Sequence, residues 1–243
     1  MPNGRTTPPG SLALTAYQHL HDEIVRGTLL PGQKLLIRDL CERYGIGLSP
    51  VREALNRLSG QRLVVHNEQR GFMVTPLSES DLEDILRARL WLNEIGLRRS
   101  IEYGDSEWEE RVVIACHRLS RTPRFWDAGN VEINPAWEEA HCLFHAGLVS
   151  ACGSAWLEKF CDQLFHAFER YRYLSRVAAA TAPLHQNAEH SAIMEAAVSR
   201  KADDAARLLR EHFDKTGRLV HKQLADMISS ATNTAGNIAE ITA

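Results

Sequence analysis

Four histidines in the second half of the sequence have the residue type and the spacing of a metal site. His141 and His145 are four residues apart, so on a helix both imidazoles lie on the same face. His190 and His212 each lie about 11 residues from a joint near Lys201, which places each about 16 Å along its own helix. In an antiparallel helical pair, residues equidistant from the turn are level with one another. The spacing therefore predicts that the four imidazoles converge inside a bundle, where metal sites are often built.

Nitrogen ligands indicate which metal such a site would take, and they favour Zn²⁺ or Ni²⁺ over Mg²⁺ or Ca²⁺. The alternative is that these histidines are ordinary structural side chains, since the chain has 11 of them. The remaining seven show no comparable spacing and are taken as structural: His19, His21, His66, His117, His166, His185 and His221. The five cysteines are scattered and form no C-x-x-C pair, which argues against a cysteine zinc site and indicates buried thiols.

The pair His141 and His145 also has the spacing of the H-E-x-x-H zinc proteases. This gives an alternative hypothesis, a metal-dependent hydrolase with an accessory winged-helix domain. The general-base Glu that those enzymes need is missing, because Cys142 stands in its place. The sequence also lacks a G-x-S-x-G elbow, a P-loop and a dinucleotide fingerprint. We therefore expect that the chain is not an enzyme.

The elements that must position the histidines are helices. Apolar periodicity after residue 78 predicts helices only, and glycines and prolines mark the breaks between them. A loop is expected from 123 to 135, and the tail from Ser229 is expected to fray. The expected helices are 79–103, 105–121, 135–151, 154–178, 184–200 and 203–228.

The first 75 residues predict a different unit, in which three helices are followed by a β-hairpin. Ser49 is placed as the N-cap of the third helix, with Pro50 at the first helical position. Three helices and a hairpin make a winged helix-turn-helix. The expected helices are 12–26, 37–44 and the one that follows Ser49, and the expected strands are 63–66 and 72–75.

The third helix has one apolar face and one polar face. Val51, Leu55 and Leu58 share a face at i, i+4 and i+7. Such a helix can be packed from behind and still read a DNA groove, whereas the alternative is an ordinary surface helix. The polar face consists of Ser49, Arg52 and Asn56.

The tip of the hairpin carries Gln69, Arg70 and Gly71. Glycine allows close backbone approach, which favours a wing that contacts a DNA groove over a hairpin that only caps the helices. The segment 12–75 has eight Lys and Arg against six Asp and Glu, whereas the whole chain has a net charge of -3. A mildly basic front on an acidic body indicates two domains with different partners, 11–75 and 79–228.

The composition is that of a soluble globular protein, with 44% hydrophobic and 24% charged residues among 243. No apolar run reaches 18 residues, so no membrane span is expected. The first ten residues are polar and lack the apolar core of a signal peptide, so we expect a cytoplasmic protein.

Four stretches of the N-terminal unit resemble the GntR family of bacterial transcription regulators. They are Pro31–Leu35, Arg38–Leu40, Pro50–Leu58 and Arg70–Phe72. The resemblance implies that Arg38, Ser49 and Arg52 contact double-stranded DNA, that the wing at Gly71 approaches the minor groove, and that the protein is a homodimer. The family often has Arg before this Ser, and Leu48 stands there instead, which removes one expected DNA contact.

The helical part resembles the effector domain, called FCD, of the FadR subgroup of that family. Many members hold a metal with an Asp, a His four residues later and two further His on the last two helices. His145, His190 and His212 match the three histidines, and His141 stands at the Asp position. The resemblance implies a small carboxylate effector at or near the metal, with Arg89 as its cationic partner.

Two shorter stretches, 151–154 and 169–173, resemble a carbon-starvation-induced member that responds to a C5 dicarboxylate. They add Tyr171 and Arg172 as candidate effector-binding residues. The sequence thus predicts a mainly α protein, in which a winged helix-turn-helix is followed by an all-α antiparallel helical bundle. Its expected function is that of a DNA-binding repressor controlled by a carboxylate and a metal.

Overall fold

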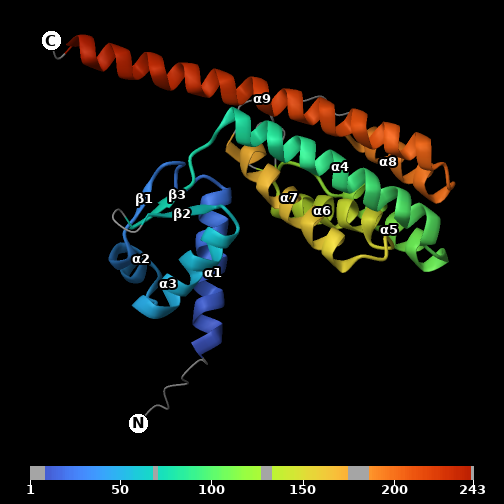
Figure 1. Ribbon diagram of the computed structural model, residues 1–243, viewed down its shortest axis with the longest axis horizontal. Helices are drawn as coiled ribbons and strands as arrows, with labels where there is room; N and C mark the ends of the chain where they lie inside the picture. Colours follow the sequence, from blue (N-terminus) through green and yellow to red (C-terminus); the bar gives the residue numbers. More distant parts are fainter. Residues whose placement is uncertain (1–8, 68–70, 127–132, 175–185, 242–243) are drawn as a thin grey trace. The chain divides into compact units, whose positions relative to one another are not determined.

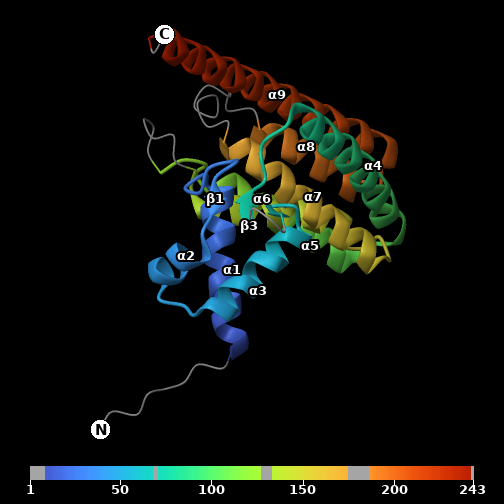
Figure 2. The same ribbon diagram turned by 60° about the vertical axis from the view of Figure 1, so that its left-hand side comes forward.

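The computed structural model describes residues 9–67, 71–126, 133–174 and 186–241. The chain divides into two compact units, Met1–Ser78 and Glu79–Ala243. Helices dominate both units (Figure 1, Figure 2), and the only sheet in the described ranges belongs to the first unit. The predicted mainly α fold is therefore confirmed. No helix of the described residues combines the length and the apolar character that a membrane span requires.

The first unit is a winged helix-turn-helix. Its elements are α1 (Pro9–Val25), β1 (Lys34–Leu35), α2 (Ile37–Tyr44), α3 (Leu48–Gly60), β2 (Val64–Asn67) and β3 (Gly71–Val74). The strands form one antiparallel sheet in the order β1-β3-β2, with Leu35 opposite Phe72 and Val64 opposite Val74. The sequence predicted the β2–β3 hairpin but missed β1, because two residues carry no periodicity to detect.

The start of α3 differs from the prediction. The helix begins at Leu48, its N-cap is Gly47, and no side chain caps it. The placement of Ser49 as the cap is therefore wrong, since Ser49 lies inside the first turn and Pro50 follows it. Pro50 is tolerated there because the first N–H groups of a helix have no partner within it. The first bond of this helix runs from the Val51 N–H to the Gly47 carbonyl, at 3.3 Å.

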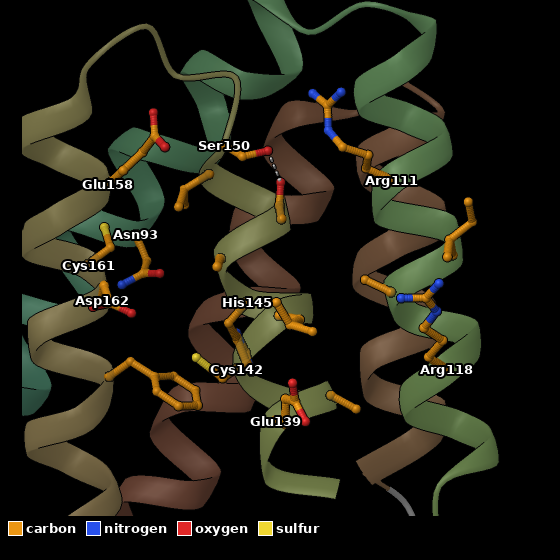
Figure 3. A pocket seen from close by; sticks show the side chains of 18 of the residues that line it. Asn93, Arg111, Arg118, Glu139, Cys142, His145, Ser150, Glu158, Cys161 and Asp162 are labelled. Atoms are coloured by element: carbon orange, nitrogen blue, oxygen red, sulfur yellow. Dashed lines mark hydrogen bonds between the residues drawn. The ribbon is translucent and has the colours of Figure 1, made fainter. Parts of the chain in front are cut away.

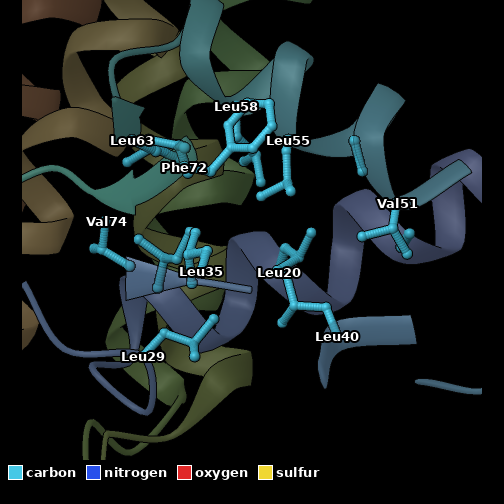
Figure 4. Packing of buried hydrophobic residues seen from close by; sticks show 14 of the residues in the cluster. Leu20, Leu29, Leu35, Leu40, Val51, Leu55, Leu58, Leu63, Phe72 and Val74 are labelled. Atoms are coloured by element: carbon cyan, nitrogen blue, oxygen red, sulfur yellow. The ribbon is translucent and has the colours of Figure 1, made fainter. Parts of the chain in front are cut away.

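The apolar faces of the three helices and the sheet pack into one core (Figure 4). Val51, Leu55 and Leu58 are all fully buried, as the periodicity of the third helix predicted. Phe72 and Val74 of β3 cover the same cluster from the sheet. This packing fixes which face of α3 is turned outward.

The second unit contains six helices in its described residues. They are α4 (Glu79–Tyr103), α5 (Ser106–Arg121), α6 (Pro135–Val149), α7 (Ala155–Leu174), α8 (Gln186–Val198) and α9 (Ala202–Ile241). α4 packs against α7 and α9, α5 packs against α6, and α8 packs against α9. The ends predicted for two helices, 175–178 and 184–185, lie outside the described residues.

The last helix is longer than the sequence suggested. α9 continues to Ile241 (Figure 1), so the prediction that the chain frays from Ser229 is wrong. The segment has no proline, and its single glycine, Gly236, costs a helix only about 1 kcal/mol relative to alanine. Small polar residues alone do not end a helix that is already formed, because propagation is much easier than nucleation.

Candidate functional site

Four imidazoles converge between α6, α8 and α9. His141 and His145 come from α6, His190 from α8 and His212 from α9. All four are buried, and one nitrogen from each lies within 4.8 Å of the others. The ring centroids of His190 and His212 are 4.6 Å apart, as are those of His141 and His145. The helices thus bring together the four residues that the spacing singled out, and their role as metal ligands stays a prediction.

α6, which carries two of these histidines, is fixed near both ends. At its start the Asn134 side chain accepts a hydrogen bond from the Ala136 N–H at 3.0 Å, and Pro135 occupies the first turn. Near its end the Gly147 carbonyl accepts a hydrogen bond from Nε1 of Trp108 on α5, at 3.0 Å. These contacts fix the position of α6, whose inward face carries His141 and His145.

The histidine cluster has the protonation state that a metal needs. Burial lowers the pKa of His141, His145 and His190 well below the ordinary value of 6.5, and it lowers the pKa of His212 as well. The imidazoles are therefore neutral at pH 7, and neutral imidazole is the form that binds a metal ion.

The donor atoms of the cluster also fit a metal. Nδ1 of His141, Nδ1 of His145 and both ring nitrogens of His190 are buried without a hydrogen-bond partner. An unpaired buried polar atom costs about 1–3 kcal/mol, and at His190, where both ring nitrogens are unpaired, a bound cation would offset that cost for one of them. The Nε2 atoms of His141 and His145 lie 3.1 Å apart. Two nitrogens at about 2.0–2.1 Å from one tetrahedral zinc would lie about 3.3 Å apart, so the separation fits.

One residue outside the cluster orients it, and the sequence analysis missed it. Oε2 of Glu189 lies 2.9 Å from Nδ1 of His212, and its other oxygen accepts a hydrogen bond from Lys215. These contacts lower the pKa of Glu189 to about 2, so the group is a carboxylate at neutral pH. The available signal was an acidic residue beside His190, on the helix that precedes His212.

Arg89 of α4 is buried beside the histidines and is not a surface residue. Its side chain is 3% exposed and lies over three phenylalanine rings. Its Nε has no hydrogen-bond partner, and no carboxylate of the described residues forms an ion pair with it. With Arg172, His141 and His212 it lines a cavity of about 10 Å³, room for roughly one water. The nearby Glu169 carboxylate acts on Arg89 without a direct ion pair, and burial lowers the Arg89 pKa to about 10. A buried cation without a direct ion pair is costly, and an anion bound beside it would lower that cost.

The two other predicted effector residues are already engaged. The guanidinium of Arg172 pairs with Glu169 and, at 3.0 Å, with Glu138, so its charge is compensated inside the protein. The hydroxyl of Tyr171 donates a hydrogen bond to Asp81 at 2.6 Å. The structure therefore places Arg89 and Arg172 beside the histidines and directs the Tyr171 hydroxyl to another partner.

A cleft of about 1000 Å³ runs along α6 and reaches His145 (Figure 3). Arg111 and Arg118 project into it from α5, and Glu158 and Asp162 line it from α7. The cleft gives the edge of the buried cluster a route to solvent. A small ligand can approach the histidines through it without unfolding the bundle.

The predicted DNA-contacting residues lie in the first unit. Arg38 on α2 is exposed, and so are Ser49, Arg52 and Asn56, which share the outward face of α3. Gly71, at the start of β3, is exposed and has a φ of +77°, a conformation that favours glycine. Gln69 and Arg70 lie outside the described residues.

Comparison with protein families gives two matches that follow the two units. Residues 12–74 match the family described as bacterial regulatory proteins, gntR family, and residues 84–215 match the FCD domain. The HTH-type transcriptional regulator BphR of Paraburkholderia xenovorans strain LB400 is 39% identical over 213 residues, covering 87% of this chain and 86% of that protein. The HTH-type transcriptional repressor GlaR of Escherichia coli K12 is 33% identical over 204 residues, covering 83% and 92%.

Solved structures share the fold at lower sequence identity. Escherichia coli McbR/YncC has a TM-score of 0.70 and 19% identity, covering 88% of this chain and 98% of that one. A putative GntR transcriptional regulator from Rhodococcus sp. RHA1 has a TM-score of 0.69 and 20% identity, covering 86% and 97%. The matched family and relatives are regulators of transcription and not enzymes, so nothing here favours the hydrolase alternative.

Proposed function

Because the chain belongs to the GntR family of bacterial regulatory proteins and carries an FCD domain, it is a DNA-binding transcription regulator, and we propose that it is a repressor controlled by a metal-bound carboxylate. One observation carries the proposal. Four buried imidazoles, three of them with unpartnered ring nitrogens, lie beside Arg89, a buried cation that forms no direct ion pair in the described residues.

His141, His145, His190 and His212 would hold a divalent transition metal, with Zn²⁺ or Ni²⁺ suited best to nitrogen ligands. Such an ion supplies a Lewis-acidic cation to which a carboxylate oxygen can bind. Glu189 keeps the proton on Nδ1 of His212, which leaves the Nε2 lone pair for the metal.

The effector would be a small carboxylate or dicarboxylate, because Arg89 is a buried cation that forms no direct ion pair and lies beside the same cluster. The cavity between Arg89 and the histidines has room for only about one water, which is less than a carboxylate group needs. An acid that binds there must widen the cavity by moving some of the side chains that line it, which include Phe168 and Phe213. Binding therefore repacks the bundle core, and a packed core shifts between discrete arrangements.

Repression would require that the winged helix-turn-helix units bind an operator. GntR regulators bind operators and commonly form dimers, and a homodimer would present two copies of α3 to half-sites about 34 Å apart. The similarity to a protein named as a repressor, GlaR, supports the direction of control. A coupling of about 1–3 kcal/mol between effector and DNA would change DNA affinity about 5- to 150-fold.

The test uses the full-length protein and DNA sequences selected from a random pool by binding to it. Mono- and dicarboxylates are added to metal-loaded and to chelator-treated protein, and the DNA affinity is measured by mobility shift. We expect one class of acid to weaken binding about 5- to 150-fold in the metal-loaded protein only. Affinity that no acid changes, or that changes equally after chelation, would refute the proposed control.

A further inference from the structure

A second cluster of metal-ligating side chains lies beside the first, between α6 and α7. Sγ of Cys142, a carboxylate oxygen of Asp162 and a ring nitrogen of His166 all lie within 4.8 Å of one another. Asp162 and His166 are four residues apart on α7, so they share one face, and their Oδ1 and Nε2 atoms are 3.5 Å apart. Figure 3 shows Cys142 on α6 and Asp162 on α7 pointing into the gap between these helices.

An aromatic ring separates this cluster from the four histidines. The ring centroid of Phe165 lies 5.4 Å from that of His141 and 5.9 Å from that of His145. The same phenylalanine stands edge-on to His166, with centroids 5.6 Å apart. The second cluster is therefore distinct from the buried one, and no side chain belongs to both.

The second cluster differs from the first in its access to solvent. Cys142 and Asp162 line the cleft along α6, and the side chains of Asp162 and His166 are about half exposed. A hydrated ion can reach these ligands without any movement of the bundle. Three protein ligands on one side leave a further coordination position facing the cleft.

We propose that Cys142, Asp162 and His166 form a second binding site for a divalent transition metal of the zinc class, with one position open to the cleft. Three ligands of the sulfur, nitrogen and carboxylate oxygen types, with a fourth position left for water, are a donor set that Zn²⁺ accepts. The thiolate selects Zn²⁺ over Mg²⁺ or Ca²⁺. Metal binding releases the thiol proton, and any proton on His166, to solvent.

The sequence analysis left His166 among the structural histidines and Cys142 among the buried thiols. The reason is that the ligands come from two helices whose lateral register no sequence spacing reveals. The inference stands on its own and does not depend on the role proposed for the four histidines.

Cobalt is the probe, because a thiolate bound to Co²⁺ gives a strong sulfur-to-cobalt charge-transfer absorption that nitrogen ligands do not give. Chelator-treated full-length protein is titrated with Co²⁺. We expect this absorption to reach a plateau by about two ions added per chain in the wild type, because the four histidines also take one ion, and by about one ion in His145→Ala. Cys142→Ser should abolish this absorption. His166→Ala should weaken Co²⁺ binding at the sulfur site at least about tenfold, because loss of a residue that only hydrogen-bonds to a ligand already weakens metal binding by that much.

Two controls and one further ligand variant make the result specific. Cys161→Ser removes a thiol that also lines the cleft, and it should leave the absorption intact. His145→Ala should remove the ion from the four-histidine site and leave the sulfur-to-cobalt band intact. The two sites are thus tested independently of each other. Asp162→Asn, which leaves α6 unchanged, should also lower the affinity. Absence of the band in the wild type, or its persistence in Cys142→Ser, would overturn the proposal.

Discussion

The Nδ1 atom of His212 lies 2.9 Å from a carboxylate oxygen of Glu189, across the contact between α8 and α9. A carboxylate can only accept, so this contact keeps the proton on Nδ1 and leaves the other ring nitrogen free for the centre of the cluster. Glu189 is thus a positioning residue that determines what His212 can do.

Replacement of Glu189 by alanine is expected to weaken metal binding about 10- to 100-fold, because His212 loses the partner that fixes its ring. The affinity is measured by competition with a chromophoric chelator. Lys215→Ala is the matched control, since it removes the other partner of Glu189 and leaves the imidazole contact in place. Equal affinities in the wild type and in Glu189→Ala would contradict this role.

Because the four histidines are buried, we expect the free energy of unfolding of the metal-free protein to decrease as the pH is lowered. Their pKa values are lowered in the folded state, whereas the unfolded chain protonates near 6.5. Below that pH the unfolded state binds more protons, so the free energy of unfolding decreases, by about 1.4 kcal/mol per pH unit for each histidine. The contribution of these histidines to the free energy of unfolding is therefore fully present above about pH 6.5 and is lost progressively as the pH falls below it.

Thermal unfolding of chelator-treated protein between pH 7.5 and 5.5 would show the effect, as a melting temperature that drops in the acid half of the range. His141→Phe, which keeps a ring against Trp137, should reduce the slope. The exposed His117 offers the control, because His117→Gln should leave the slope unchanged. A flat profile in the wild type would show that the folded imidazoles titrate normally.

On the DNA side, Arg52→Ala should lower affinity for the selected operator by about 1–3 kcal/mol, the loss expected for one good side-chain contact to a base. Arg57 is the control on the same helix, because its guanidinium lies over the Tyr17 ring at 4.0 Å and belongs to another face. Titration of labelled operator DNA by both variants would separate the two. An equal loss in both would mean that α3 does not read DNA with this face.

Arg89→Met should abolish the response to a carboxylate, because it removes the buried cation while an unbranched side chain keeps the packing against the phenylalanine rings. In the metal-loaded wild type, an acid at 100 times its dissociation constant adds about 2.7 kcal/mol. This corresponds to a thermal shift of roughly 5–10 °C for a chain of this size. Arg99→Met, at an exposed position of the same helix, should keep the full shift. A shift that survives Arg89→Met would place the acid elsewhere.

Much of the fold followed from periodicity, because helices longer than ten residues repeat their apolar positions often enough to be recognised. The prediction failed where no repeat exists. It missed the two-residue strand at Lys34, and it placed the cap of α3 at Ser49, whereas the N-cap is Gly47 and no side chain caps the helix. The convergence of the four histidines was predictable because His141 and His145 share a helix face at i and i+4, and because His190 and His212 are equally far from the joint between their helices.

Contacts that depend on how helices are rotated against their neighbours were not predictable. The burial of Arg89, the ion pairs of Arg172 and the carboxylate of Glu189 all depend on such lateral packing. The same holds for Cys142 and His166, which are adjacent only because α6 and α7 are neighbours. Sequence spacing gives a position along a helix axis, and the direction of a side chain around that axis relative to a partner comes from the packed structure.

The four histidines come from three helices, of which α6 is distant along the chain from α8 and α9, and this has a consequence for chain entropy. An ion held by His145 of α6 and His212 of α9 closes the whole stretch between them into a covalent-like loop. Such a cross-link restricts the unfolded ensemble and raises the cost of opening α8, which lies inside the loop. Amide hydrogen exchange in α8 should therefore slow when the ion binds. The exchange rate of α8 then reports whether the four-histidine site holds an ion.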